Sequence, residues 1–117
     1  MIKSIFVDNV EYVPASNNIQ NDDGLECCVI RTESAGVFYG FVKSVNGDVV
    51  ELLNSRRIWR WYGAASLSQL AQEGVTKPED CKIAMIEPIK TIKGWIEITP
   101  LTKDAKESLD GVEEWKM

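Results

Sequence analysis

The side chains best suited to chemistry in this 117-residue sequence lie close together, in the stretch RRIWRWYGAAS at residues 56–66. Guanidinium groups stack on aromatic rings and keep donors free for phosphate or carboxylate, which is how proteins hold nucleotides and single-stranded bases. Small residues let a ligand approach the backbone, and the free N–H groups at a helix start attract anions. The stretch therefore predicts an anion-binding site, with Arg57 or Arg60 as the arginine that binds the anion.

Alternation along a strand divides this stretch between two faces. The residues on one face are Arg57, Trp59 and Trp61, and those on the other are Arg56, Ile58, Arg60 and Tyr62. A second interpretation stays open, in which Trp59 and Trp61 belong to the core and the arginines pair with the surplus carboxylates. Both interpretations can hold on opposite faces of one strand.

A second candidate site lies at RTESAGVFYG, residues 31–40. The sequence Ser34-Ala35-Gly36 interrupts two β-type runs, and a turn or bulge at a sheet rim can aim the side chains of residues 31–33 into a shared pocket. An ordinary hairpin connection is the alternative. Taken together, the predicted ligand-binding residues are Arg31, Arg57, Trp59, Arg60, Trp61, Gly63, Ala64, Ala65 and Ser66.

Catalysis and metal binding find little support in the composition. The chain has no histidine, which removes the commonest general base and metal ligand. Cys27, Cys28 and Cys81 lack metal-type spacing, so buried reduced thiols are expected. We therefore expect no enzyme, no metal and no cofactor. The net charge of −5 disfavours nucleic acid as a partner, because nonspecific affinity for phosphates needs excess Lys and Arg.

Most of the chain shows β-type patterns. Two short runs in residues 2–13 surround Asp8-Asn9, and residues 14–24 are a polar, acidic loop. Asn46-Gly47 is a strong hairpin signal, and the run before it is apolar on both faces, so this hairpin should be covered on each side. Between the acidic loop and the first helix, the expected strands are residues 26–32, 36–45, 48–53 and 56–62.

Two short helices are expected among the remaining strands. Ser66 can cap a helix that Gly74 ends, and a second helix over residues 103–110 is capped at or near Thr102 and ends at Gly111. Between them, residues 81–92 are extended, with Pro88 confining that part to an edge or a bulge. Residues 94–100 alternate, which places Ile96 and Ile98 on one face and Trp95 and Glu97 on the other.

These elements predict a mainly β (α+β) fold, a small bent antiparallel sheet or barrel with two short helices. The length fits a single domain over residues 1–117. No apolar run is long enough to span a bilayer, and the N-terminus lacks the features of a cleaved signal, so no membrane partner and a cytoplasmic location are expected.

Three stretches resemble a family of short phage and prophage proteins of unknown function: VIRTESAGVFYGFV, RRIWRWYGAASLSQLAQEGVTKPEDCKI and the closing GVEEW. The family patterns R-T-x-S-A-G-V, R-x-W-x-W-x-G-A-A-S-L-S-x-L-A and G-x-x-x-P-E-x-C-K fall on residues 31–37, 57–71 and 74–82. The resemblance covers residues 27–115, so the hairpin and acidic loop of residues 1–25 look like an addition to a core of residues 26–117. Glu33 departs from the aromatic usual in the family, which would alter any pocket there.

The resemblance implies a phage setting, and hence the host cytoplasm, without an established activity. Small proteins of such a setting often act by binding. The leading hypothesis is a non-enzymatic binding protein, such as a counter-defence protein that sequesters a nucleotide-like anionic small molecule. The alternative is a protein–protein module that inhibits a host protein or serves the virion. Single-stranded nucleic-acid binding ranks below both, and a homo-oligomer would create shared pockets.

Overall fold

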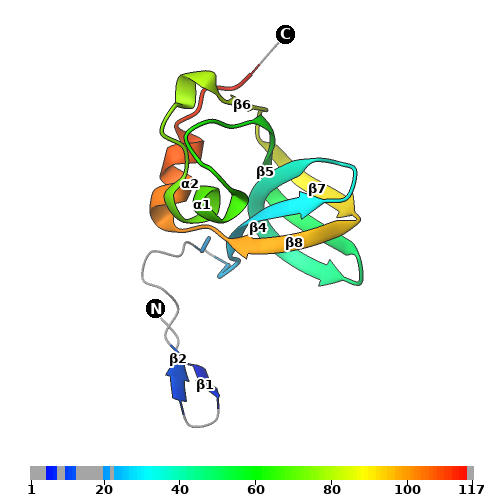
Figure 1. Ribbon diagram of the computed structural model, residues 1–117. Helices are drawn as coiled ribbons and strands as arrows, with labels where there is room; N and C mark the ends of the chain where they lie inside the picture. The colour runs from blue at the N-terminus through cyan, green and yellow to red at the C-terminus, as the bar shows by residue number, and fades with distance from the viewer. Residues whose placement is uncertain (1–4, 8–9, 13–19, 22, 116–117) are drawn as a thin grey trace.

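The computed structural model describes residues 5–7, 10–12, 20–21 and 23–115, the first two ranges as backbone only. Its main body is an open antiparallel sheet of six strands with two helices (Figure 1), which confirms the predicted fold class in its bent-sheet form. No helix among these residues is long and apolar enough to cross a membrane. The elements of the main body are β3 Cys27–Thr32, β4 Val37–Asn46, β5 Val49–Arg60, α1 Leu67–Glu73, a 3-10 helix η1 Pro78–Asp80, β6 Lys82–Ile83, β7 Glu87–Lys93, β8 Trp95–Pro100 and α2 Lys103–Asp110.

The N-terminal pair of strands is confirmed. β1 (Ile5–Val7) pairs antiparallel with β2 (Val10–Tyr12). The predicted turn at Asp8-Asn9 and most of the polar loop of residues 14–24 lie outside the described residues.

The sheet bends because β7 and β8, which follow each other in the sequence, pair with strands on opposite sides of it. Gly94 alone separates β7 from β8, yet β7 pairs with β5 and β8 pairs with β3 (Figure 1). The Gly94 N–H donates to the carbonyl of Asp48 at 2.8 Å, and the Glu33 N–H donates to the Gly94 carbonyl at 2.9 Å. This corner therefore ties the β3–β4 connection to the β4–β5 turn. β7 pairs with one strand only, which agrees with the edge position predicted for Pro88.

The two faces of the sheet bury two separate clusters. On the face that the helices cover, Val29, Tyr39 and Ile58 pack with residues of α1 and α2, among them Leu70 and Leu109. On the other face, inside the bend, the buried residues are Cys28, Ile30, Phe38, Val50, Leu52 and Ile92. The prediction that this hairpin is covered on both sides is confirmed for the first part of β4, where residues 38–40 are buried, and is wrong for residues 43–46, which are exposed. All three cysteines are free and buried, as expected.

β5 differs from the prediction of two strands at residues 48–53 and 56–62. It is one strand of 12 residues, joined to β4 by a turn at Gly47-Asp48, one residue later than expected. A bulge keeps it continuous: the register with β4 shifts between Tyr39 and Phe41, and Asn54 has a positive φ of 50°. β5 ends at Arg60, so Trp61 follows the strand rather than lying within it.

Both helix caps are confirmed. The Ser66 hydroxyl accepts from the N–H of Gln69 at 3.1 Å, and the Thr102 hydroxyl accepts from the N–H of Ala105 at 3.1 Å. The predicted alternation in residues 94–100 is wrong at its start. Trp95 and Ile98 pack against the same cluster, because a register shift at Arg31/Thr32 lets β8 place both side chains inside the bend.

Candidate functional site

The two tryptophans predicted to share a face point to different surfaces. Trp59 remains on β5 and is 55% exposed, so its assignment to the core is wrong. Trp61 lies beyond the strand end and packs against the cluster on the helix-covered face. Strand alternation stops applying after Arg60, and this is why Trp61 does not follow Trp59.

Trp61 lines a hollow of about 380 Å³ between the start of α1, the end of β3, the start of β4 and the middle of β8. This volume lies within the usual range of small-molecule sites. Arg31, on β3, faces the same hollow and was predicted as a site residue. The lining residues are Arg31, Val37, Trp61, Ser66, Leu67, Ser68 and Glu97, and we call this the Arg31–Trp61 hollow.

The Arg31–Trp61 hollow has hydrogen-bonding groups to spare. The Arg31 guanidinium lies 3.7 Å from a carboxylate oxygen of Glu97, a loose pair whose side chains are 54% and 47% exposed. Exposed pairs of this kind contribute little to stability. Within the described part of the chain, the Ser68 hydroxyl and the indole N–H of Trp61 make no hydrogen bond, and the Ser66 hydroxyl only accepts one. Several donors and one carboxylate therefore remain free to meet a ligand.

The small residues of the turn are explained by packing. Gly63 has a φ of 88°, and a Cβ there would lie 2.1 Å from Oγ1 of Thr76, so Thr76 already fills that space. Ala64 packs against the helix-side cluster. The Ala65 N–H donates to the side chain of Gln69 at 2.8 Å, which completes a reciprocal cap with Ser66. Of this turn, only Ser66 lines the hollow.

Arg57 and Arg60 do not meet in this hollow. The guanidinium of Arg57 lies over the ring of Phe38 at 4.7 Å and near that of Trp59 at 5.1 Å, on the opposite face of β5. Arg60 lies 5.6 Å from the ring of Tyr62. The alternative interpretation expected both arginines to pair with carboxylates, but among the described residues neither forms an ion pair. The second candidate stretch contributes Arg31 and the apolar Val37 to the hollow. Thr32 is not part of it, since its hydroxyl donates to the Gly36 carbonyl, and neither is the exposed Glu33.

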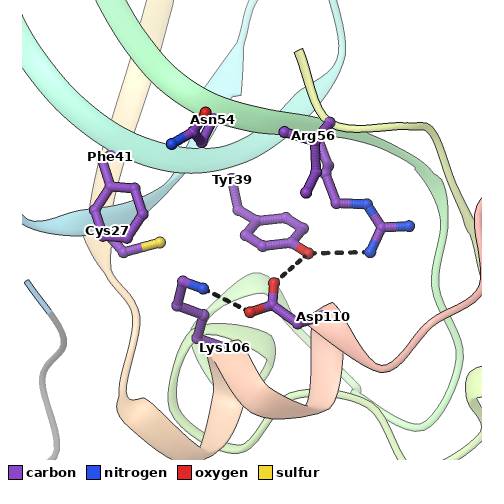
Figure 2. Close-up of a pocket in the computed structure, with 8 residues that line it drawn as sticks. Cys27, Tyr39, Phe41, Asn54, Arg56, Lys106 and Asp110 are labelled. Atoms are coloured by element: carbon purple, nitrogen blue, oxygen red, sulfur yellow. Dashed lines mark hydrogen bonds and ion pairs between the residues drawn. The ribbon is translucent and has the colours of Figure 1, made fainter. Parts of the chain in front are cut away.

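Arg56, the first arginine of the stretch RRIWRWYGAAS, was not among the predicted ligand-binding residues. It is only 4% exposed and borders a second hollow, of about 420 Å³, between the sheet and α2 (Figure 2). Its guanidinium donates to four backbone carbonyls and to the Tyr39 hydroxyl at 3.2 Å. The carbonyls, at 2.7 to 3.3 Å, belong to Ile83, Ala84, Leu109 and Val112.

Four polar side chains of this second hollow, those of Tyr39, Arg56, Lys106 and Asp110, are joined by hydrogen bonds and an ion pair (Figure 2). The Tyr39 hydroxyl donates to a carboxylate oxygen of Asp110 at 2.9 Å, and Lys106 pairs with the other oxygen. Burial raises the pKa of the Tyr39 hydroxyl above its ordinary value. Desolvation likewise raises the pKa of the Cys27 thiol from 9.0 to about 12, so it stays protonated at neutral pH. The side chains of this hollow hold the C-terminal segment against the sheet, and they offer no activated nucleophile.

Among the described residues, no group of three or more cysteine, aspartate or glutamate side chains could hold a metal ion. The Arg31–Trp61 hollow is thus the better candidate of the two. Sequence reasoning missed Ser68 and Glu97, which belong to it. Ser68 lies two residues from the predicted Ser66, whereas no local pattern connects Glu97 with Arg31.

Comparison with known proteins gives one match. Residues 25–109 match the family described as Domain of unknown function (DUF6948). No curated protein and no solved structure matches the chain.

Proposed function

The chain belongs to the DUF6948 family of domains of unknown function, and we propose that it is a non-enzymatic protein that binds a planar, anionic small molecule of the nucleotide class. The Arg31–Trp61 hollow is the proposed site. One observation carries the proposal: an arginine, an indole and two serine hydroxyls from separate segments line one hollow and keep unused donors.

Each of these groups suits one part of such a ligand. The planar fork of Arg31 can bind a phosphate through two hydrogen bonds, and Glu97 holds it only loosely at 3.7 Å. Trp61 offers an aromatic edge or face to a base. The hydroxyls of Ser66 and Ser68 can donate to further phosphate oxygens. Glu97 can accept from a sugar hydroxyl or an exocyclic amine, which would favour a nucleotide over inorganic phosphate.

Two of the three patterns that carry the phage-family resemblance meet at this hollow. Residues 31–37 and 57–71 contribute all of its lining residues except Glu97. The phage setting suggests a biological role, in which the protein sequesters a host signalling nucleotide during infection. Sequestration needs binding without turnover, and the protonated Cys27 thiol and the lack of histidine agree with the second requirement.

Calorimetric titration of the full chain with mono-, di- and cyclic nucleotides tests the proposal. We expect a Kd of about 1–10 μM for at least one of them, measured with protein at about 100 μM. Arg31→Ala should weaken that binding at least about tenfold, and Trp61→Phe less, because a ring remains. Arg60→Ala is the matched control, since Arg60 lies outside the hollow, and it should bind as the unmodified chain does.

The proposal fails if no nucleotide of the panel releases or absorbs heat at this concentration. It fails equally if Arg31→Ala and Arg60→Ala weaken binding by the same factor, because that would place the ligand elsewhere. Thermal unfolding of each variant, followed by circular dichroism, ensures that weakened binding does not reflect lost folding.

A further inference from the structure

A row of cations and aromatic rings runs across the face of β5 opposite the helices. Arg57 lies between the rings of Phe38 and Trp59, at 4.7 and 5.1 Å. Trp59 meets Trp115 edge to face, with ring centres 6.2 Å apart, and Lys82 lies 5.0 Å from the Trp115 ring. The row thus connects β4, β5 and β6 with the segment that follows α2. We call its outer part, Arg57, Trp59, Lys82 and Trp115, the tryptophan surface.

The tryptophan surface leaves large apolar groups in water. Trp59 is 55% exposed and Trp115 is 38% exposed, although the two rings touch. Tryptophan and arginine are the residues most enriched among those that dominate binding energy at protein interfaces. The two indoles, with the Arg57 guanidinium against the Trp59 ring, are therefore suited to contact another protein.

Arg57 also has binding capacity that the fold does not use. Its Nε is buried without a hydrogen-bond partner, and its terminal nitrogens form no hydrogen bond or ion pair within the described residues. Lys82 contacts the Trp115 ring, and no ion pair joins it to another residue of the described ranges. Glu113 is exposed and lies two residues before Trp115 in the segment that pairs with Ile83 through Glu114, and residues two apart on an extended segment share a side. This segment thus adds a carboxylate to the cations of the surface.

This mixture of charges decides which partner fits. A single strand of nucleic acid that stacked a base on Trp115 would meet a segment with a carboxylate two residues away, at Glu113, in a chain whose net charge is −5. A two-fold interface, in contrast, requires a patch that complements itself. Rotating the surface onto a second copy can bring Arg57 or Lys82 of one copy to Glu113 of the other while the indoles pack together.

We propose that the tryptophan surface joins two copies of this chain in a two-fold symmetric dimer. Arg31 and Trp61 take no part in it, so the dimer and the ligand site can be tested separately. Since four side chains make only a small interface, the dimer should be weak, with a Kd of about 10–100 μM.

Sedimentation velocity of the full chain from about 1 to 200 μM tests the dimer. We expect the sedimentation coefficient to rise from the monomer to the dimer value over this range. Trp59→Glu should shift the midpoint at least about tenfold upward. Glu113→Lys, which removes no packing, should also weaken the dimer, and Ile96→Glu should leave it unchanged because Ile96 is equally exposed on the distant strand β8.

Three results would overturn the proposal. The unmodified chain could stay monomeric throughout the range. Ile96→Glu could weaken association as much as Trp59→Glu does. A 20-nucleotide oligo-dT could bind to the monomer and lose its binding with Trp59→Glu, which would assign the surface to nucleic acid. Melting temperatures of the variants close to that of the unmodified chain show that each is folded.

Discussion

Replacing Arg56 by methionine removes the group that ties the C-terminal third of the chain to β5. Methionine keeps the apolar stem of the side chain but has no donor. Four carbonyls, from residues 83–84 and 109–112, then lose their partner in a place where Arg56 is only 4% exposed. The Tyr39 hydroxyl loses a donor as well, and the Asp110 carboxylate beside it loses a nearby positive charge.

The expected loss of stability follows from the carbonyl groups that stay buried after the substitution. Hydrogen bonds from a charged donor each contribute about 1.5–3 kcal/mol, but five bonds of one group do not add, because water and small shifts satisfy part of the carbonyls. A buried acceptor left without a partner costs about 1–3 kcal/mol, and since only part of the four carbonyls stays unsatisfied we expect Arg56→Met to lower the free energy of unfolding by about 3–5 kcal/mol in total. Arg56→Lys should lose about half as much, since an ammonium has three donors and no planar fork.

Urea unfolding followed by tryptophan fluorescence measures the effect. With a slope of about 1–3 kcal/mol per molar urea, Arg56→Met should lower the midpoint by about 2 M. Arg60→Met is the matched control, because Arg60 is exposed, and it should stay within about 0.5 kcal/mol of the unmodified chain. If Arg56→Met also stays within about 1 kcal/mol, the guanidinium is not what holds the two segments, and the reasoning fails.

Two further predictions concern the core. Burial raises the pKa of Cys28 from 9.0 to about 12, so above pH 9 the unfolded chain releases a proton that the folded chain keeps. The free energy of unfolding should therefore fall by about 1 kcal/mol per pH unit for this thiol between those values, and Cys28→Ala should flatten the slope by that amount in alkaline urea titrations; an unchanged slope contradicts this. Gly40→Ala would place a Cβ 2.6 Å from that of Ser55, and it should lower the free energy of unfolding by about 1–3 kcal/mol and the melting temperature by several degrees. Gly111→Ala, whose Cβ would have nothing nearer than 3.4 Å, should leave the melting temperature unchanged. Equal melting temperatures of the two variants would show that the bulge adapts.

Local signals in the sequence predicted much of the fold. The caps at Ser66 and Thr102 and the hairpin near Asn46-Gly47 depend on residues within a few positions of one another, and the structure confirms them. The bulge at Asn54 was not predicted, because a single non-glycine residue with positive φ leaves no pattern when apolar residues stand on both sides. Two expected strands are consequently one.

The candidate site was predicted only in part. Strand alternation placed Arg56 on the face of Ile58, which is buried, and this was the available signal that Arg56 rather than Arg57 enters the core. Its partners lie about 27 and 53 residues away along the chain, where no local pattern can indicate them. The same distance in sequence hid the approach of Glu97 to Arg31.

The pairing of β8 with β3 has a consequence for the order in which the chain can fold during synthesis. β3, β4 and β5 emerge in sequence and can form a meander at once, since each contacts the strand before it. The outer side of β3 must wait for β8, which is synthesised only after α1, β6 and β7. Until then β3 presents unpaired backbone groups between two buried faces, a state prone to aggregate. The last strand of the sheet thus also protects the first, and ribosome-bound chains that end before Trp95 are expected to remain incompletely folded.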